Sequence, residues 1–262
     1  MGTLFANIIA IYRKELATYF AAPFSYVIAG VFWLFSGSTF YNILQFRIQE
    51  TALNDQFGGG GSIDVPYIVL QEFLGALTML TFFLLPMLSM GLYAEERRRG
   101  TLELLATAPI TNWVVALGKL MGVVTFFMTM VLPLMIYEAI AFSTADPPLP
   151  MNMIVVGHLG LILMGAAVLS VGMFISSLTE RTILSAILTF IVVIFLLILD
   201  GLANSIAGPV GEALGHLSLL RHYANFVQGI VDTSSIVLFL SYIFLGIFLT
   251  AQSVELLRFQ RS

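Results

Sequence analysis

Six long apolar runs separated by short polar segments dominate the chain. They extend over about 24–45, 67–93, 113–141, 152–177, 182–202 and 234–256. A helix needs roughly 20 apolar residues to cross a hydrocarbon core of about 30 Å, and each run is long enough. The pattern therefore predicts an all-α polytopic membrane protein, with six transmembrane helices in a single domain over 1–262.

A different periodicity precedes the first run. Apolar residues recur there at spacings of three and four, at Phe5, Ile8, Ile9, Tyr12, Leu16, Tyr19 and Phe20. Such a stripe predicts an amphipathic helix over 1–22 that lies in the membrane interface. A soluble N-terminal helix is the alternative. Pro23 predicts a turn into the first span, because the residue before a proline avoids helical geometry.

Composition and charge support this class. The chain is 59% hydrophobic and 10% charged, which leaves too little polar surface for a soluble protein of 262 residues. It has no cysteine, which excludes disulfides, thiol nucleophiles and thiolate metal sites. Most basic residues fall at the end of the predicted bundle that holds both termini: Arg13, Lys14, Arg97, Arg98, Arg99, Lys119, Arg181, Arg258 and Arg261. Only Arg47 and Arg221 lie opposite, so we expect cytoplasmic termini in a bacterial-type inner membrane.

The connection 95–111, between the second and third runs, is the most charged part of the chain. Its charges cannot remain in hydrocarbon and mark the membrane boundary. Gly100 is expected to break the helix, Thr101 to cap a new short helix and Pro109 to end it, with Thr111 capping the next span. The product is a lever lying across the membrane surface between two long helices. The alternative is a solvated loop that carries ordinary positive-inside arginines.

Three runs carry a resemblance to a known family. Residues 95–109, EERRRGTLELLATAP, followed by Gly118-Lys119, closely resemble the E-E-[KR]-x-x-G-T-x-E-x-L-x-x-x-P…G-K pattern of ABC-2 type transporter permeases. Residues 12–26 resemble the start of such permeases, especially of the gliding-motility-associated branch. Residues 222–232, HYANFVQGIVD, resemble the family's H-[FY]-x-x-F-x-x-G-x-[IV]-D run. The matches are spread over nearly the whole chain.

The resemblance implies a permease subunit, with export as the expected direction, that pairs with a second permease copy and binds a separate ABC ATPase. ATP and magnesium would be bound by that ATPase, and we expect no catalytic, cofactor or metal residue here. No P-loop is present, since Gly118-Lys119 is followed by Leu120. By the same resemblance, a coupling helix between the second and third spans would contact the ATPase through Glu95, Glu96, Arg97, Arg98, Gly100, Thr101, Leu102, Glu103, Leu104, Leu105 and Pro109.

The connections at the opposite end differ in character. Residues 47–66 contain a Gly-rich stretch and are predicted to form a mobile outer loop. Residues 143–150 are rich in proline and predict a short, stiff connection. Residues 204–228 are too polar for a span and too apolar for an ordinary loop, and the resemblance implies a partly re-entrant segment there.

Ionisable residues within the runs are costly in lipid and point to partners or cavities. Glu72, Glu138, His158 and Asp200 map near the outer ends of their spans. They are consistent with a polar vestibule, a mutual pairing network, a proton relay or residues that water reaches at the interface. Gly118 and Gly122 have the G-x-x-x-G spacing that allows close helix contact, a weak packing signal.

Two other function classes stay open on the sequence. An ion-coupled carrier would use Glu138, His158 or Asp200, and a membrane scaffold would anchor a cell-surface or gliding-type machine. Besides the ATPase and a second copy, we expect lipid and an auxiliary surface or periplasmic protein as partners, and no nucleic acid.

Overall fold

The chain is helical throughout the part that the computed structural model describes, which comprises residues 2–56, 64–102, 110–146 and 148–259. These residues contain no strand, which confirms the predicted all-α class. The helices are α1 (Gly2–Ala21), α2 (Pro23–Gln56), α3 (Val65–Ser89), α4 (Ala94–Arg98), α6 (Asn112–Ser143), α7 (Met151–Leu178), α8 (Thr182–Ser205), α9 (Pro209–Leu217), α10 (Leu219–Val227) and α11 (Thr233–Phe259).

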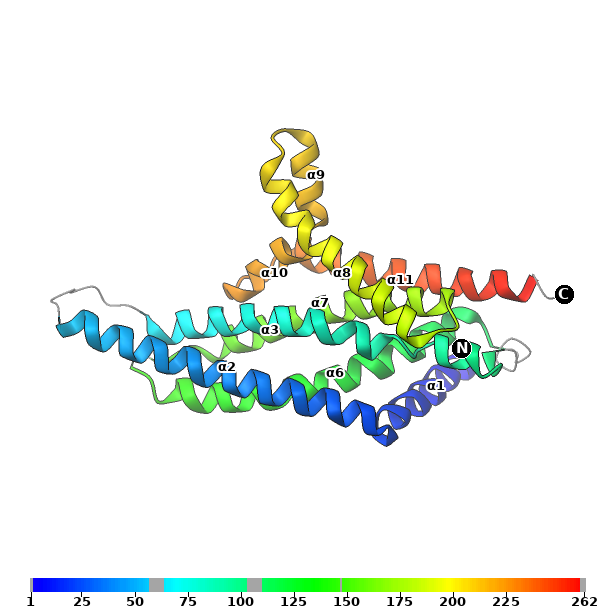
Figure 1. Ribbon diagram of the computed structural model, residues 1–262, viewed down its shortest axis with the longest axis horizontal. Coiled ribbons are helices and arrows are strands. Elements are labelled where there is room, and N and C mark those ends of the chain that lie inside the picture. The colour runs from blue at the N-terminus through cyan, green and yellow to red at the C-terminus, as the bar shows by residue number, and fades with distance from the viewer. Residues whose placement is uncertain (1, 57–63, 103–109, 147, 260–262) are drawn as a thin grey trace.

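Six stretches of the described residues are long and apolar enough to cross a membrane. They are Pro23–Asn54, Val65–Arg98, Asn112–Ser143, Met151–Leu178, Thr182–Ser205 and Thr233–Leu256, so the six predicted spans are confirmed. The two ends of the chain lie at the same end of the elongated bundle, as an even number of spans requires (Figure 1).

Helix α7 is the centre of the bundle and packs against α3, α6, α8, α10 and α11. Small residues allow these contacts. A side chain at Gly172 would collide with Ser89 on α3, and one at Gly246 on α11 would collide with Ser170 on α7. Glycine thus brings the helices close enough for extensive van der Waals contact. This contact drives helix association in lipid, because lipid tails are as apolar as the side chains and the hydrophobic effect is absent there.

Helix α2 corrects one prediction. Residues 47–56 were predicted to begin a loop, but α2 continues to Gln56. Arg47 explains the extension, since its guanidinium binds Glu50 one turn on and Glu72 on α3. These ion pairs satisfy the charges while the backbone remains helical. The Gly-rich stretch 58–62 lies outside the described residues.

Helix α1 ends at Ala21 and α2 begins at Pro23, so the predicted turn is confirmed. The apolar stripe of α1 divides between two environments. One part packs on α6, where added side chains at Gly118 and Gly122 would collide with Ile11 and Glu15. The other part, including Phe5 and Ile9, is exposed. The G-x-x-x-G spacing therefore does mark a helix contact, and its partner is α1.

The segment before the last span folds into two short helices joined at Ser218. Helix α10 packs against α7, α11, α8 and α3, whereas α9 pairs with the end of α8 and stands away from the long axis of the bundle (Figure 1). Two short helices explain why this region is both polar and apolar, because each helix buries only one side. Its re-entrant position in a membrane stays a prediction.

Candidate coupling site at the base of the α3–α6 connection

A single hydroxyl fixes the corner between α3 and α4. Ser176 on α7 is fully buried, and its Oγ donates a hydrogen bond to the carbonyl of Met90 at 2.8 Å. The same Oγ accepts from the backbone N–H groups of Tyr93 at 3.1 Å and Ala94 at 3.0 Å. These backbone groups would otherwise be unsatisfied where one helix ends and the next begins. The corner is therefore attached to α7.

Behind this corner lies a cluster of two lysines and two glutamates. Lys119 on α6 is only 2% exposed, and its Nζ lies 3.2 Å from Glu15 Oε2 on α1 and 3.0 Å from Glu96 Oε1 on α4. It also donates to the carbonyl of Leu92 at 2.8 Å. Lys14 reaches Glu96 Oε1 from the surface at 2.9 Å. The four formal charges sum to zero, and the cluster joins α1, α4 and α6.

Lys14 forms the exposed side of this cluster. Partial burial disfavours its charge, but the hydrogen bond and the charge of Glu96 outweigh burial and raise the pKa of Lys14. The ammonium therefore stays charged at neutral pH.

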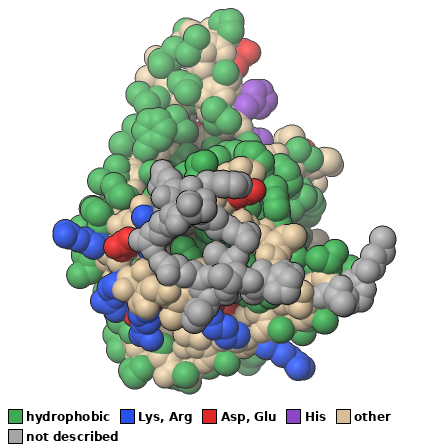
Figure 2. All heavy atoms as spheres, turned by 90° about the vertical axis from the view of Figure 1, so that its right-hand side faces the viewer, with side chains coloured by type: hydrophobic (Ala, Val, Ile, Leu, Met, Phe, Trp, Pro, Cys, Tyr) green, Lys and Arg blue, Asp and Glu red, His purple; other side chains and the backbone are tan. Residues whose placement is uncertain are grey.

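The arginines of the connection divide into one internal and two outward residues. Arg97 donates to the Ser177 carbonyl in the last turn of α7 at 3.1 Å and to Glu180, just after this helix, at 3.2 Å. Arg98 and Arg99 share Glu95 and are 59% and 66% exposed. Lys and Arg side chains gather on this end of the molecule (Figure 2). Only the outward pair is available to a partner without breaking a tertiary contact.

Gly100 ends α4 as predicted, with a left-handed φ of 71° that favours glycine. Thr101 stands directly before the helical residue Leu102, at the position predicted for a cap, and its hydroxyl donates to the carbonyl of Glu96 at 3.2 Å. The rest of the short helix predicted after it lies outside the described residues. Leu102 packs partly against the core. Thr111 does occupy the cap position of α6, but its hydroxyl makes no capping bond. The remaining predicted coupling residues Glu103, Leu104, Leu105 and Pro109 lie outside the described residues.

Sequence reasoning missed four members of this site: Lys14, Lys119, Glu15 and Ser176. A signal existed for Lys119, since it is the one basic residue inside the third apolar run and therefore needs an acidic partner. Its partner Glu15 is 104 positions away, which no local pattern indicates.

The four predicted vestibule residues do not meet at one place. Glu138 and His158 face one another, Glu72 binds Arg47, and Asp200 accepts a hydrogen bond from Ser218 at 3.2 Å. Among the described residues, no three His, Asp or Glu side chains are placed to hold a metal ion together.

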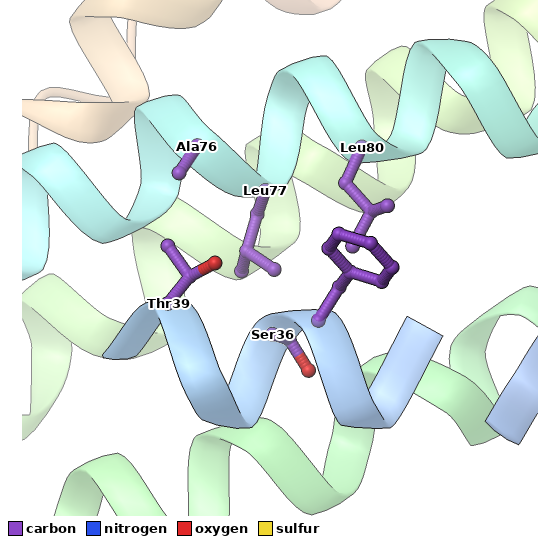
Figure 3. A pocket seen from close by; sticks show the side chains of 6 residues that line it. Ser36, Thr39, Ala76, Leu77 and Leu80 are labelled. Carbon is purple, nitrogen blue, oxygen red and sulfur yellow. The ribbon is translucent and has the colours of Figure 1, made fainter. Parts of the chain in front are cut away.

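A cavity of about 230 Å³ lies between α2 and α3. Its lining is mostly apolar, with two hydroxyl groups, and consists of Phe35, Ser36, Thr39, Ala76, Leu77 and Leu80 (Figure 3). No candidate site residue contributes to it.

The run 222–232 joins α10 to α11. His222 Nδ1 lies 2.9 Å from the hydroxyl of Ser235, which in turn donates to Asp232 at 3.3 Å. Phe226 is fully buried, and Gly229 takes a φ of 77° where the chain turns. The motif therefore has a structural role, which is to fix the turn before the last span.

A family model described as ABC-2 family transporter protein matches residues 9–261, nearly the whole chain. No curated protein matches the chain.

Proposed function

The chain belongs to the ABC-2 family of transporter proteins, and from this premise we propose that it is a permease subunit that couples ATP hydrolysis by a separate ABC ATPase to export. ATP and magnesium would be bound by that ATPase. The observation that carries the proposal is the buried cluster of Glu15, Lys119 and Glu96 directly behind the exposed Arg98 and Arg99.

The cluster suits the base of a lever. A displacement of α4 cannot be absorbed locally, because Glu96 is bound to both α1 and α6, and Arg97 is bound to the end of α7. Separating these buried charges would leave them without partners, at a cost of several kcal/mol. A push on the connection is therefore transmitted to three other helices. The contacted surface of the ATPase would be acidic, to complement Arg98 and Arg99.

Pairing with a second copy is part of the proposal. Helix α8 exposes large apolar side chains at regular spacing: Ile183, Ile187, Ile191, Phe195 and Ile198. This face can pack against lipid or against the same face of another copy. The proposed orientation has both termini in the cytoplasm of an inner membrane, on the basis of the basic residues. An auxiliary surface protein and a gliding-type machine are proposed from the sequence resemblance alone.

The proposal is tested by purifying the tagged protein from native membranes in mild detergent and measuring co-purifying ATPase. A double variant, Arg98→Glu with Arg99→Glu, should reduce the bound P-loop ATPase at least about tenfold, since like charges would then face one another. It should leave membrane insertion intact, because neither arginine contacts another helix. We avoid Arg97, whose bonds to α7 would confound the result.

The matched control is Arg13→Glu, a charge reversal on α1 outside the connection. The control should retain the ATPase. The proposal is wrong if both preparations carry the same amount of ATPase as the wild type, or if a monodisperse wild-type preparation carries none.

A further inference from the structure

Glu138 on α6 and His158 on α7 form a second buried ionisable site, remote from the coupling site. Both side chains are 0% exposed, and Glu138 Oε1 lies 3.2 Å from His158 Nε2. Glu138 is five residues before the end of α6 and His158 is seven residues after the start of α7. The pair thus lies near the end of the bundle opposite the two termini (Figure 1).

The histidine tautomer follows from its other contact. Nδ1 lies 2.9 Å from the backbone carbonyl of Ile154. A carbonyl oxygen only accepts hydrogen bonds, so Nδ1 carries a hydrogen and donates it. Neutral histidine then has a lone pair on Nε2, and this lone pair points to the side that faces Glu138.

One further proton is required between these two groups. Without it, a carboxylate would face a lone pair, and a net negative charge would be buried among membrane helices. With it, the pair is either a neutral carboxylic acid beside a neutral imidazole or a carboxylate beside an imidazolium, and both are neutral overall. We propose that Glu138 and His158 form a proton-binding site that fastens α6 to α7 while one proton is shared between them.

The surroundings contain hydroxyl groups rather than a competing cation. Tyr137 precedes Glu138 on α6, and Tyr223 on α10 lies within reach of the charge of Glu138. Arg47, Glu72 and Asp200 are engaged elsewhere. Nothing else in the described structure therefore neutralises the carboxylate once the proton leaves.

Proton release has a mechanical consequence. The proton passes to water, and the pair becomes a buried anion opposed to a lone pair. Repulsion then favours separating the ends of α6 and α7, which are joined by residues 144–150. The site does not depend on an ATPase partner, so it can be tested on the purified chain alone.

The first test assigns the proton directly in the full-length protein at pH 7.5. Nitrogen-15 NMR of labelled histidine distinguishes neutral imidazole from imidazolium, and His158→Gln identifies the signal of His158 among the three histidines. Infrared spectroscopy detects a protonated carboxyl group, and Glu138→Gln identifies the band of Glu138. Either an imidazolium or a protonated carboxyl group is expected. A neutral imidazole together with an ionised carboxylate would overturn the proposal.

The second test uses stability against pH. Above about pH 6.5 an unfolded chain holds no proton on these two groups, whereas the folded pair holds one. Stability should therefore fall as pH rises above this value, lowering the thermal midpoint by roughly 3 °C per pH unit. Glu138→Gln needs no proton, because its amide can donate to Nε2, so its profile should be flat there. Glu72→Gln is the control and should keep the wild-type slope. Equal slopes in wild type and Glu138→Gln would overturn the proposal.

Discussion

At the scale of single residues, the contrast between Lys119 and Lys14 shows that position decides what a charge contributes. Both lysines bind Glu96, but Lys119 is 2% exposed and Lys14 is 61% exposed. A buried charge that loses its partner stays in a medium of low dielectric, whereas water replaces the partner of an exposed one. The ion pair of Glu96 with Lys119 therefore stabilises the fold, whereas the ion pair of Glu96 with Lys14 contributes little to stability.

This contrast predicts unequal effects for the same substitution. Lys119→Met should lower the free energy of unfolding by about 3–5 kcal/mol, because it leaves the buried Glu15 without its cation and Glu96 with Lys14 alone. Lys14→Met removes an exposed partner and should cost about 1 kcal/mol or less. Chemical unfolding of the purified protein in detergent measures both. Similar losses for the two variants would contradict the structure of the cluster.

A neighbouring pair of serines gives a matched test of the α3–α4 corner. Ser176→Ala removes the oxygen that binds Met90, Tyr93 and Ala94 and should cost about 1–3 kcal/mol, since buried backbone groups lose their partner. Ser177→Ala removes only a bond to Phe174 within α7 and should cost less. If ATPase stimulation is measured as well, Ser176→Ala should reduce it. Equal stimulation by the two variants would argue against a role of the corner in coupling.

At the scale of elements, the turn between α10 and α11 is expected to respond to acid. Burial lowers the pKa of His222, against smaller opposing effects from its neighbours. The folded state therefore resists protonation while the unfolded state takes up a proton near pH 6.5. Because the unfolded state binds more protons, the contribution of His222 to stability should fall as pH decreases below about 6.5 and be constant above it.

The corresponding experiment compares His222→Gln with His216→Gln. The first should flatten the acid side of the profile of thermal midpoint against pH, and the second, at an exposed position, should not. The loss of stability below about pH 6.5 is separate from the loss above that pH that is expected from Glu138. An unchanged acid limb in His222→Gln would exclude this histidine as its source.

Element boundaries show how far sequence reasoning reaches. The spans were predictable because length and hydrophobicity alone decide whether a helix can cross a bilayer, and Pro23 and Gly100 mark breaks through local backbone constraints. The extension of α2 past Arg47 was not predictable from local pattern, because it depends on Glu72 in another helix. The hydrogen bond from Thr101 to the Glu96 carbonyl was not predicted, since the expected role of Thr101 was to cap the helix that follows it.

At the scale of the whole molecule, the position of the candidate site in the chain was predictable, but the contacts that build the site were not. The charged connection was identified from its composition and its resemblance. The prediction included Glu96 and Arg97 among the residues that contact a partner, yet both face inward. Whether a charge of the connection faces inward or outward depends on partners that are distant in the sequence, and a single sequence does not reveal these partners. Arg98 and Arg99, which face outward, therefore test the ATPase contact more directly than Arg97.

The pairing of Glu15 with Lys119 has a consequence for how the chain is made. The two residues are separated by 104 positions, and synthesis proceeds at about 5–20 residues per second. About 5–20 s therefore pass between the synthesis of Glu15 and that of Lys119, and Glu96 is also made before Lys119. During this interval the first two spans emerge while Glu15 and Glu96 have Lys14 as the only cation of the cluster. The nascent N-terminal helix thus has to remain in contact with water or lipid headgroups until the third span is complete, and only then can it settle into place.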